Sequence, residues 1–244
     1  MLRIAIFGAT SGIAEAAARD FAKDGAQFFL CARNAVALAD MAADLKVRGS
    51  AHIDTRVADL SDAGSLSALC EEARAALGGI DVALIAHGVL PEQALCEASA
   101  EKTLEVLQIN TMSPAALMIQ LGQIMAAQGS GSLVILSSVA GDRGRPSNFI
   151  YGASKALLSV LGEGMALKLA ARGVKVLVVK PGFVDTKMTA AFKKGLLWAS
   201  AAEVGGAIVA AVKAGGSGTI YTPGWWRLIM LIVKFAPGFV VRRM

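Results

Sequence analysis

Short apolar runs alternate along the chain with longer alanine-rich or amphipathic segments. The apolar runs are continuous, as is typical of strands buried on both faces. We expect strands at residues 3–7, 27–31, 52–57, 81–86, 132–136, 174–180 and 219–221. The segments between them predict helices at 12–23, 34–47, 61–77, 97–127, 149–171 and 201–214. Strictly alternating strands and helices predict an α/β fold around a parallel, doubly wound sheet.

No change of composition and no Pro/Gly/Ser-rich linker divides the chain, and no internal repeat is visible. The pattern therefore predicts a single domain of the Rossmann type over residues 1–221, with residues 222–244 as a separate C-terminal tail.

The tail contains an apolar segment, 225–235, bracketed by Pro223 and Pro237. Arg227 and Lys234 are seven residues apart and share one narrow helical stripe, and every other face is apolar. Eleven residues are too few to span a bilayer. Two interpretations remain open: a helix buried against the body or another subunit, or a helix lying on a membrane surface.

The basic charge is concentrated at the C-terminal end. The chain carries a net charge of +5, and acidic and basic residues cancel up to Glu203. The excess comes from Lys213, Arg227, Lys234, Arg242 and Arg243. This distribution argues against nucleic-acid binding over the body and indicates a local basic patch. Hydrophobic residues make up 55% of the chain and the mean hydropathy is +0.56, so some apolar surface needs a partner beyond an ordinary core.

Composition also limits the compartment and the metal chemistry. Cys31, Cys70 and Cys96 are widely spaced and odd in number, which favours reduced thiols in a cytoplasmic protein. His52 and His87 are the only histidines, so no metal site is expected. The first apolar run is too short for a secretory signal, and no apolar run is long enough to span a membrane.

A glycine-rich turn follows the first strand and opens the first helix. It has the sequence Gly8-Ala-Thr-Ser-Gly-Ile-Ala14. Glycines let the backbone approach a pyrophosphate, and the helix N-terminus supplies free N–H groups. We expect a dinucleotide there, on Gly8, Thr10, Ser11, Gly12 and Ile13; the alternative is an ordinary strand-to-helix turn.

Arg33 stands at the end of the second strand, where an acidic residue would bind the ribose hydroxyls of NAD. An arginine can instead pair with a 2′-phosphate, so the sequence predicts that NADP(H) is preferred over NAD(H). A solvated arginine is the alternative. Asp59, after the third strand, is placed to accept a hydrogen bond from the adenine amine.

Three side chains indicate catalysis. Ser138 ends the fifth strand, Tyr151 follows thirteen residues later, and Lys155 lies four residues beyond on the same helical face. A free tyrosine has a pKa near 10, and a neighbouring cation favours the phenolate. Ser138 can stabilise the charge on a carbonyl oxygen while Tyr151 exchanges a proton with it. Alone, the Tyr-x-x-x-Lys spacing is also compatible with a structural helix.

Together these residues resemble the short-chain dehydrogenase/reductase family, in its single-domain branch. The resemblance implies a relay-supporting asparagine at Asn110, an adenine contact at Asp59-Leu60, and cofactor contacts at Ala86, Gly88, Pro181, Gly182, Val184 and Thr186. Two departures stand out. Ala14 replaces the third glycine of the turn, and Ile85-Ala86-His87-Gly88 stands where the family has Asn-Asn-Ala-Gly, so both asparagines are lost. His87 either takes part in the site or is a packed, capping histidine.

Within the family, the chain is most similar to reductases of polyprenyl-phosphoryl keto-sugars, through Arg143-Gly-Arg145, residues 148–155 and the tail. That resemblance implies an apolar or lipid-linked carbonyl substrate, with residues 187–200 as part of its pocket, and peripheral membrane contact through the tail.

The helices at 97–127 and 149–171 resemble the family's dimer-forming pair, which implies a homodimer or homotetramer. A catalytically silent dinucleotide sensor or scaffold with the same fold is the alternative function.

Overall fold

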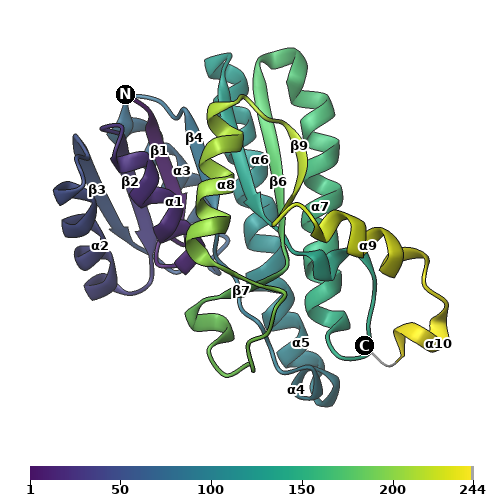
Figure 1. Cartoon of the computed structure of the whole chain (residues 1–244). Coiled ribbons are helices and arrows are strands. Elements are labelled where there is room, and N and C mark those ends of the chain that lie inside the picture. Colours follow the sequence, from purple (N-terminus) through teal and green to yellow (C-terminus); the bar gives the residue numbers. More distant parts are fainter. Residues whose placement is uncertain (243–244) are drawn as a thin grey trace.

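Seven parallel strands form the central sheet (Figure 1), and the computed structural model describes residues 1–242. Arg243, part of the basic tail noted above, lies outside the described residues. The spatial order is β3-β2-β1-β4-β5-β6-β9. The strands are β1 (Arg3–Phe7), β2 (Gln27–Ala32), β3 (His52–Val57), β4 (Val82–Ile85), β5 (Gly131–Leu136), β6 (Val174–Pro181) and β9 (Gly218–Thr222). This confirms the predicted single-domain, doubly wound α/β fold.

Helices cover both faces of the sheet. The helices α1 (Gly12–Ala22), α2 (Ala35–Val47) and α8 (Ala201–Lys213) pack on one face. The helices α3 (Leu66–Leu77), α6 (Ser113–Gln128) and α7 (Phe149–Leu169) pack on the other. Figure 1 shows α1 and α8 in front of the sheet and α6 and α7 behind it.

The continuous apolar strands follow from this double covering. In β1, Ile4 and Ile6 belong to the core on the α1 side, while Ala5 and Phe7 belong to the core on the α6 side. Successive side chains of a strand point to opposite faces, so every position of such a strand must be apolar.

The winding direction changes between β1 and β4. From β1 the chain winds outward to β2 and β3, and from β4 it continues to β5 and β6 on the other side. The loops after β1 and β4 therefore separate at the carboxyl edge of the sheet, where open α/β sheets bind their ligands.

The single helix predicted over residues 97–127 is wrong. The chain there forms α4 (Gln93–Ala98), α5 (Ala100–Leu107), a π-helical turn (Gln108–Met112) and α6. Ser99 has extended backbone and its side chain accepts a hydrogen bond from the Lys102 N–H, so a new helix starts there. Apolar residues continue through both breaks, which is why the pattern alone could not reveal them.

Other boundaries also differ from the prediction. The helix expected from residue 61 starts at Leu66, because Asp59 and Asp62 accept the Ser61 and Gly64 backbone N–H groups and form turns. The pattern also missed a small parallel pair, β7 (Phe183–Asp185) with β8 (Trp198–Ser200). Three-residue strands are too short to show a period. Short 3₁₀ turns occupy 139–142, 170–172 and 187–189.

The tail forms α9 (Trp226–Phe235) and α10 (Gly238–Val241), which extend away from the body in Figure 1. Trp226 and Met230 are buried against Val139. The opposite face of α9 is apolar but exposed, through Leu228, Leu231, Ile232 and Phe235. Within residues 1–242, no helix is both long and apolar enough to cross a membrane.

We predict opposite effects of two alanine substitutions in α8. A Cβ at Gly205 would lie 2.7 Å from the Ala17 backbone nitrogen of α1, whereas one at Gly206 meets only the end of the Asp20 side chain at 3.6 Å. Gly205→Ala should lower the free energy of unfolding by about 1–3 kcal/mol through overpacking. Gly206→Ala should raise it by roughly 0.5–1 kcal/mol through helix propensity. Urea unfolding measures both, and equal effects would contradict the close helix contact.

Candidate active site

The glycine-rich turn is fixed against the neighbouring strand. Gly8 adopts the left-handed conformation (φ 88°), and the backbone N–H groups of Gly8 and Ala9 both donate to the Cys31 carbonyl at 2.9 Å. Helix α1 then begins at Gly12, with Ser11 as an N-cap that makes no side-chain cap. The N–H groups of the first turn are therefore free for a ligand. Ala14, the departure from the family pattern, is fully buried in the core.

A cavity of about 680 Å³ lies beside this turn, at the carboxyl edge of the sheet. It is lined by every residue predicted to contact the cofactor: Gly8, Thr10, Ser11, Gly12, Ile13, Arg33, Asp59, Leu60, Ala86, Gly88, Tyr151, Lys155, Pro181, Gly182, Val184 and Thr186. Ser138 lines it too. Of the predicted site residues, Asn110 alone is not in the lining and is instead completely buried behind it.

One end of the cavity carries a cation beside a carboxylate. Arg33 is exposed at the end of β2. The pKa of Asp59 is lowered, first by hydrogen bonds from Ser61 and to a smaller extent by the charge of Arg33. Both hydrogen bonds from Ser61 go to Asp59 Oδ1, at 3.0 and 2.9 Å, so Oδ2 is not used by them. This end offers a free guanidinium and a carboxylate oxygen to a polar ligand.

Lys155 is held by the end of β5. Its Nζ donates to the Leu136 carbonyl at 3.0 Å, and the side chain is buried. Ser137 Oγ in turn donates to the Lys155 carbonyl at 2.8 Å, and Ser159 Oγ donates to the same oxygen at 3.0 Å. The strand end and the helix are thus joined in both directions. Burial lowers the pKa of Lys155 to about 8.

Tyr151 lies one helical turn before Lys155, and the ammonium is 5.7 Å from the centre of the phenol ring. Burial raises the pKa of Tyr151 to about 12, and a hydrogen bond with Ser138 lowers it by less. The expectation that the ammonium makes this phenol more acidic is therefore wrong for the protein alone, because desolvation has the largest effect on the pKa of Tyr151 and raises it. At neutral pH Tyr151 carries its proton.

Ser138 is placed by a close approach of two backbone segments. The 3₁₀ turn Val139–Asp142 follows it directly and packs on α7. A Cβ at Gly152 would lie 2.8 Å from the Ala140 carbonyl oxygen, so a larger residue would push the turn away. Ser138 Oγ accepts the Ala140 N–H at 3.1 Å. The glycine next to Tyr151 thereby allows serine and phenol to meet.

Asn110 supports the loop after β4. Its Oδ1 accepts the Val89 N–H at 2.7 Å and its Nδ2 donates to the Val89 carbonyl at 2.8 Å. It belongs to the π-helical turn, an irregularity frequently found at functional sites. Asn110 thus supports Gly88 and the cavity wall from behind.

His87 bridges three segments at the point where the winding changes. Ser113 Oγ donates to the Leu60 carbonyl, so it accepts from His87 Nε2 at 2.9 Å. Burial, and then the Lys155 charge, lower the pKa of His87 to about 3, so the ring is neutral. Its backbone lies against Gly8. These contacts connect the loops after β1, β3 and β4, as expected of a packed histidine. His87 also lines the cavity.

A buried ion pair that sequence reasoning missed lies beside the site. Lys180 Nζ is 2.8 Å from Asp142 Oδ1, with each side chain 8% exposed, and Tyr221 donates its hydroxyl to Asp142 Oδ2 at 2.7 Å. The pair fixes the 3₁₀ turn after Ser138 to β6 and β9. The residues are far apart in sequence, so no spacing rule could find them.

The other end of the cavity is mostly apolar. Its lining includes Val89, Leu90, Pro91, Met188, Phe192, Trp198 and Trp226. Phe183 stacks on Trp198 at 5.5 Å and meets Trp226 edge-on at 5.6 Å, which joins the tail to the β7–β8 pair. Residues 187–200 were expected here. Trp226, Arg145 and Asn148 were not recognised as lining residues, although Arg145 and Asn148 lie in the loop between Ser138 and Tyr151.

The comparisons with known proteins agree with this site. The family model described as short chain dehydrogenase matches residues 3–196. An uncharacterized oxidoreductase of Mycobacterium tuberculosis (strain H37Rv) is 35% identical over 241 residues, covering 99% of this chain and 96% of that protein. One from Streptomyces coelicolor is 35% identical over 243 residues, covering 98% and 94%. These similarities support an NAD(P)-dependent oxidoreductase over a silent sensor.

Solved structures share the fold. Levodione reductase superposes with a TM-score of 0.81 at 23% identity, covering 91% of this chain and 96% of that one. A variant of actinorhodin polyketide ketoreductase, solved with NADPH, also gives 0.81 at 23% identity, covering 92% and 97%. At this identity the likeness concerns the fold.

We predict that neither tyrosine of the folded protein ionises at pH 10. The chain has two, Tyr151 and Tyr221, and burial raises the pKa of both, to about 12 for Tyr151. A free phenol is half ionised at pH 10. Absorbance at the tyrosinate band should stay flat between pH 7 and 10 in the native protein and rise with an apparent pKa near 10 in urea. A native transition at or below pH 10 would contradict the buried, protonated phenol.

Proposed function

This chain belongs to the short-chain dehydrogenase family of oxidoreductases, and we propose that it reduces a carbonyl to an alcohol with NADPH, using Tyr151 as the proton donor. The proposal rests on one observation above all. Ser138, Tyr151 and Lys155 line the same cavity as the glycine-rich turn, although they come from different parts of the chain. The reverse oxidation uses the same residues.

The chemistry follows from the three side chains. The glycine-rich turn and Arg33 would hold NADPH, which would supply the hydride for the carbonyl carbon. Tyr151 Oη donates its proton to the carbonyl oxygen, and its raised pKa keeps that proton available at neutral pH. The Ser138 hydroxyl donates a hydrogen bond to the same oxygen and stabilises its developing charge. Lys155, with a pKa near 8, returns a proton to Tyr151, and Asn110 supports the loop beside it.

The cavity suits a phosphorylated dinucleotide. The first turn of α1 presents backbone N–H groups for the pyrophosphate, and Arg33 presents a guanidinium for the 2′-phosphate. Asp59 and Leu60 lie on the adenine side, and Val184 and Thr186 on the nicotinamide side. Thr186 approaches the turn itself, since its Cγ2 would lie 3.4 Å from a Cβ at Gly12.

We assign an apolar or lipid-linked substrate to the other end. Aromatic and aliphatic side chains dominate there, as in pockets that bury apolar ligands. A polyprenyl-phosphoryl keto-sugar is one substrate of this kind, and the proposal rests on this lining together with the sequence resemblance.

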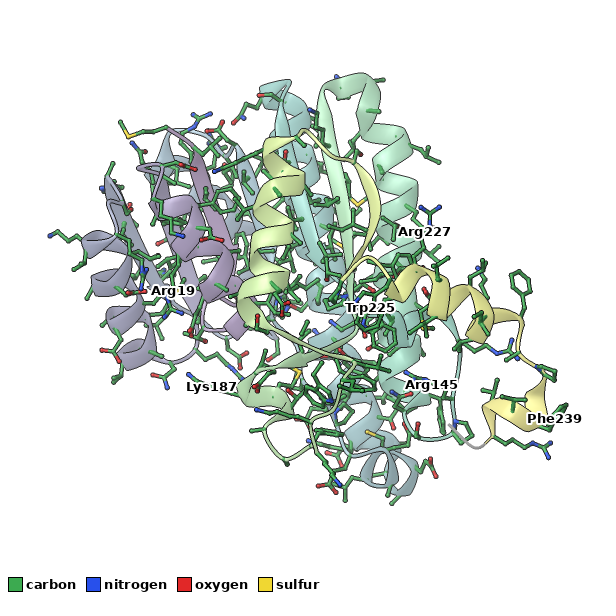
Figure 2. All side chains as sticks on the ribbon, viewed as in Figure 1. Arg19, Arg145, Lys187, Trp225, Arg227 and Phe239 are labelled. Carbon is green, nitrogen blue, oxygen red and sulfur yellow. The ribbon has the colours of Figure 1, made fainter. Side chains whose placement is uncertain are left out.

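The tail, residues 222–244, fits a peripheral membrane contact. The exposed apolar side chains of α9 lie on the same helix as Arg227, which Figure 2 labels, and Lys234, and exposed Arg242 follows them in the tail. No acidic residue follows Glu203 in the sequence. Basic residues near an anionic leaflet each contribute about 1 kcal/mol. Trp226, on the same helix, lines the cavity that also contains Tyr151, so a membrane-bound tail would hold this cavity next to an amphiphilic substrate.

We further propose a cytoplasmic homodimer or homotetramer. Helix α7 carries exposed apolar side chains at Leu157, Val160 and Leu167, which suit a contact with a second copy. The three cysteines are buried and free, as suits a reducing compartment.

Tyr151→Phe should abolish turnover and spare cofactor binding. Losing the general acid should lower kcat by roughly 10²–10⁴-fold. NADPH fluorescence on titration with the variant measures binding, and NADPH oxidation with a panel of ketones measures turnover. Unchanged turnover would refute the role of Tyr151.

Arg33→Ala should weaken NADPH binding about tenfold and leave NADH binding unchanged, because only NADPH carries the 2′-phosphate. Arg56→Ala is the matched control, because it removes the same charge from the adjacent strand. Arg56 pairs with Glu72 and does not line the cavity. Equal losses for both nucleotides, or in both variants, would remove the assignment of Arg33.

Replacing Ile232 and Phe235 by Asp should reduce binding to vesicles of phosphatidylcholine and phosphatidylglycerol at least tenfold. These side chains are 73% and 76% exposed, so the fold should tolerate the change, and each would lose roughly 1.5–3 kcal/mol of apolar burial. Val36→Asp with Val47→Asp on α2 controls for added charge. Co-sedimentation measures the effect, and equal binding of all three proteins would exclude the membrane contact.

A further inference from the structure

The charge balance of the cavity leaves one cation unexplained. Among residues 1–242, four cationic side chains line it, Arg33, Arg145, Lys155 and Lys187, against a single carboxylate, Asp59. Under the proposed function, Arg33 meets the 2′-phosphate and Lys155 serves the proton transfer. Lys187 is exposed at the rim. Arg145 is half-buried and has no assigned role.

Arg145 lies at the substrate end. It belongs to the loop that joins the 3₁₀ turn after Ser138 to helix α7, which carries Tyr151. Figure 2 shows it on the side of the molecule that carries Trp225 and the tail, far from Arg19 on α1. Strands β1 and β4 separate this loop, which follows β5, from Arg33 at the end of β2. The phosphate that Arg33 would bind is therefore not the partner of Arg145.

The guanidinium of Arg145 has no partner within residues 1–242. Its Nε is fully enclosed yet makes no hydrogen bond, and no carboxylate pairs with it. Burial lowers the pKa of Arg145, as expected for a cation that nothing nearby compensates. Asn148, three residues on, also lines the cavity, and its side-chain Oδ1 is enclosed without a partner. Buried polar groups of this kind normally have partners.

We infer that Arg145, with the Asn148 amide, forms a subsite for an oxyanion, a phosphate or carboxylate carried by the substrate. This inference rests on the proposed function and names its substrate class: an amphiphilic carbonyl compound with an anionic group. A guanidinium presents two parallel N–H donors that match two oxygens of such a group. The apolar lining beside it, including Trp226 and Phe192, takes the hydrocarbon part.

The test is ligand binding to the full chain saturated with NADP⁺, which blocks the cofactor's own phosphate sites. Octyl phosphate, octanoate and octanol share one chain and differ in the head group, and calorimetry gives their dissociation constants. The wild type should bind an anionic ligand about 10- to 100-fold more tightly than octanol. Arg145→Gln should remove that difference, and Arg145→Lys should restore part of it.

Arg143→Gln is the matched control, because it removes the same charge two residues away without lining the cavity. It should bind all three ligands as the wild type does. Equal binding of anions and octanol by the wild type, or equal losses in the two Gln variants that both still bind NADP⁺, would overturn the subsite. Preference for octyl phosphate or for octanoate identifies the anion.

Turnover separates this inference from the proposed function. Reduction of neutral ketones without any preference for anionic ligands would leave the reductase standing and remove the subsite. Anion binding lost in Arg145→Gln, without turnover of any carbonyl, would leave the subsite standing and remove the proposed reaction.

Discussion

The active site depends on the attachment of helix α7 to the carboxyl end of strand β5. Lys155 donates to a carbonyl of the strand, and Ser137 of the strand donates to a carbonyl of the helix. These reciprocal bonds fix how far the helix lies along the strand and how it is rotated. Because Ser138 follows Ser137 directly and Tyr151 lies one turn before Lys155, the same bonds bring the hydroxyl groups of Ser138 and Tyr151 together.

The attachment also sets the electrostatics. This attachment keeps the Lys155 ammonium away from bulk water, with a backbone carbonyl as its hydrogen-bond partner. Burial therefore lowers the pKa of Lys155. The same burial makes Tyr151 hold its proton more strongly. The two shifts separate the pKa values of Tyr151 and Lys155, and the phenol holds its proton more strongly than the ammonium does. Transfer from the phenol therefore requires an acceptor whose charge is stabilised at the same moment, which is what the Ser138 hydroxyl and the bound substrate would provide.

Local sequence patterns were sufficient for features that depend on neighbouring residues. The positions of the strands in the sequence followed from apolar runs such as that of β1. The residues of the site followed from the turn at Gly8, the spacing of Tyr151 and Lys155, and the resemblance to the family. Features that depend on distant contacts were not predictable. The break at Ser99, the Lys180–Asp142 pair and the burial of Trp226 against Val139 each need a partner from elsewhere in the chain. The pKa of Tyr151 was misjudged for the same reason, since desolvation is a property of the packed site.

The family match covers the residues proposed for catalysis but only part of the apolar end of the cavity. The family match ends at residue 196, and it includes the glycine-rich turn, Ser138, Tyr151 and Lys155. Trp198 and Trp226, which close the apolar end, come after it. Trp226 packs on Gly182 with one face of its helix, and the other face of that helix is exposed and apolar. A change in the tail would therefore alter the shape of the apolar end of the cavity and the outer surface together, while the hydrogen bonds between β5 and α7 stay unchanged.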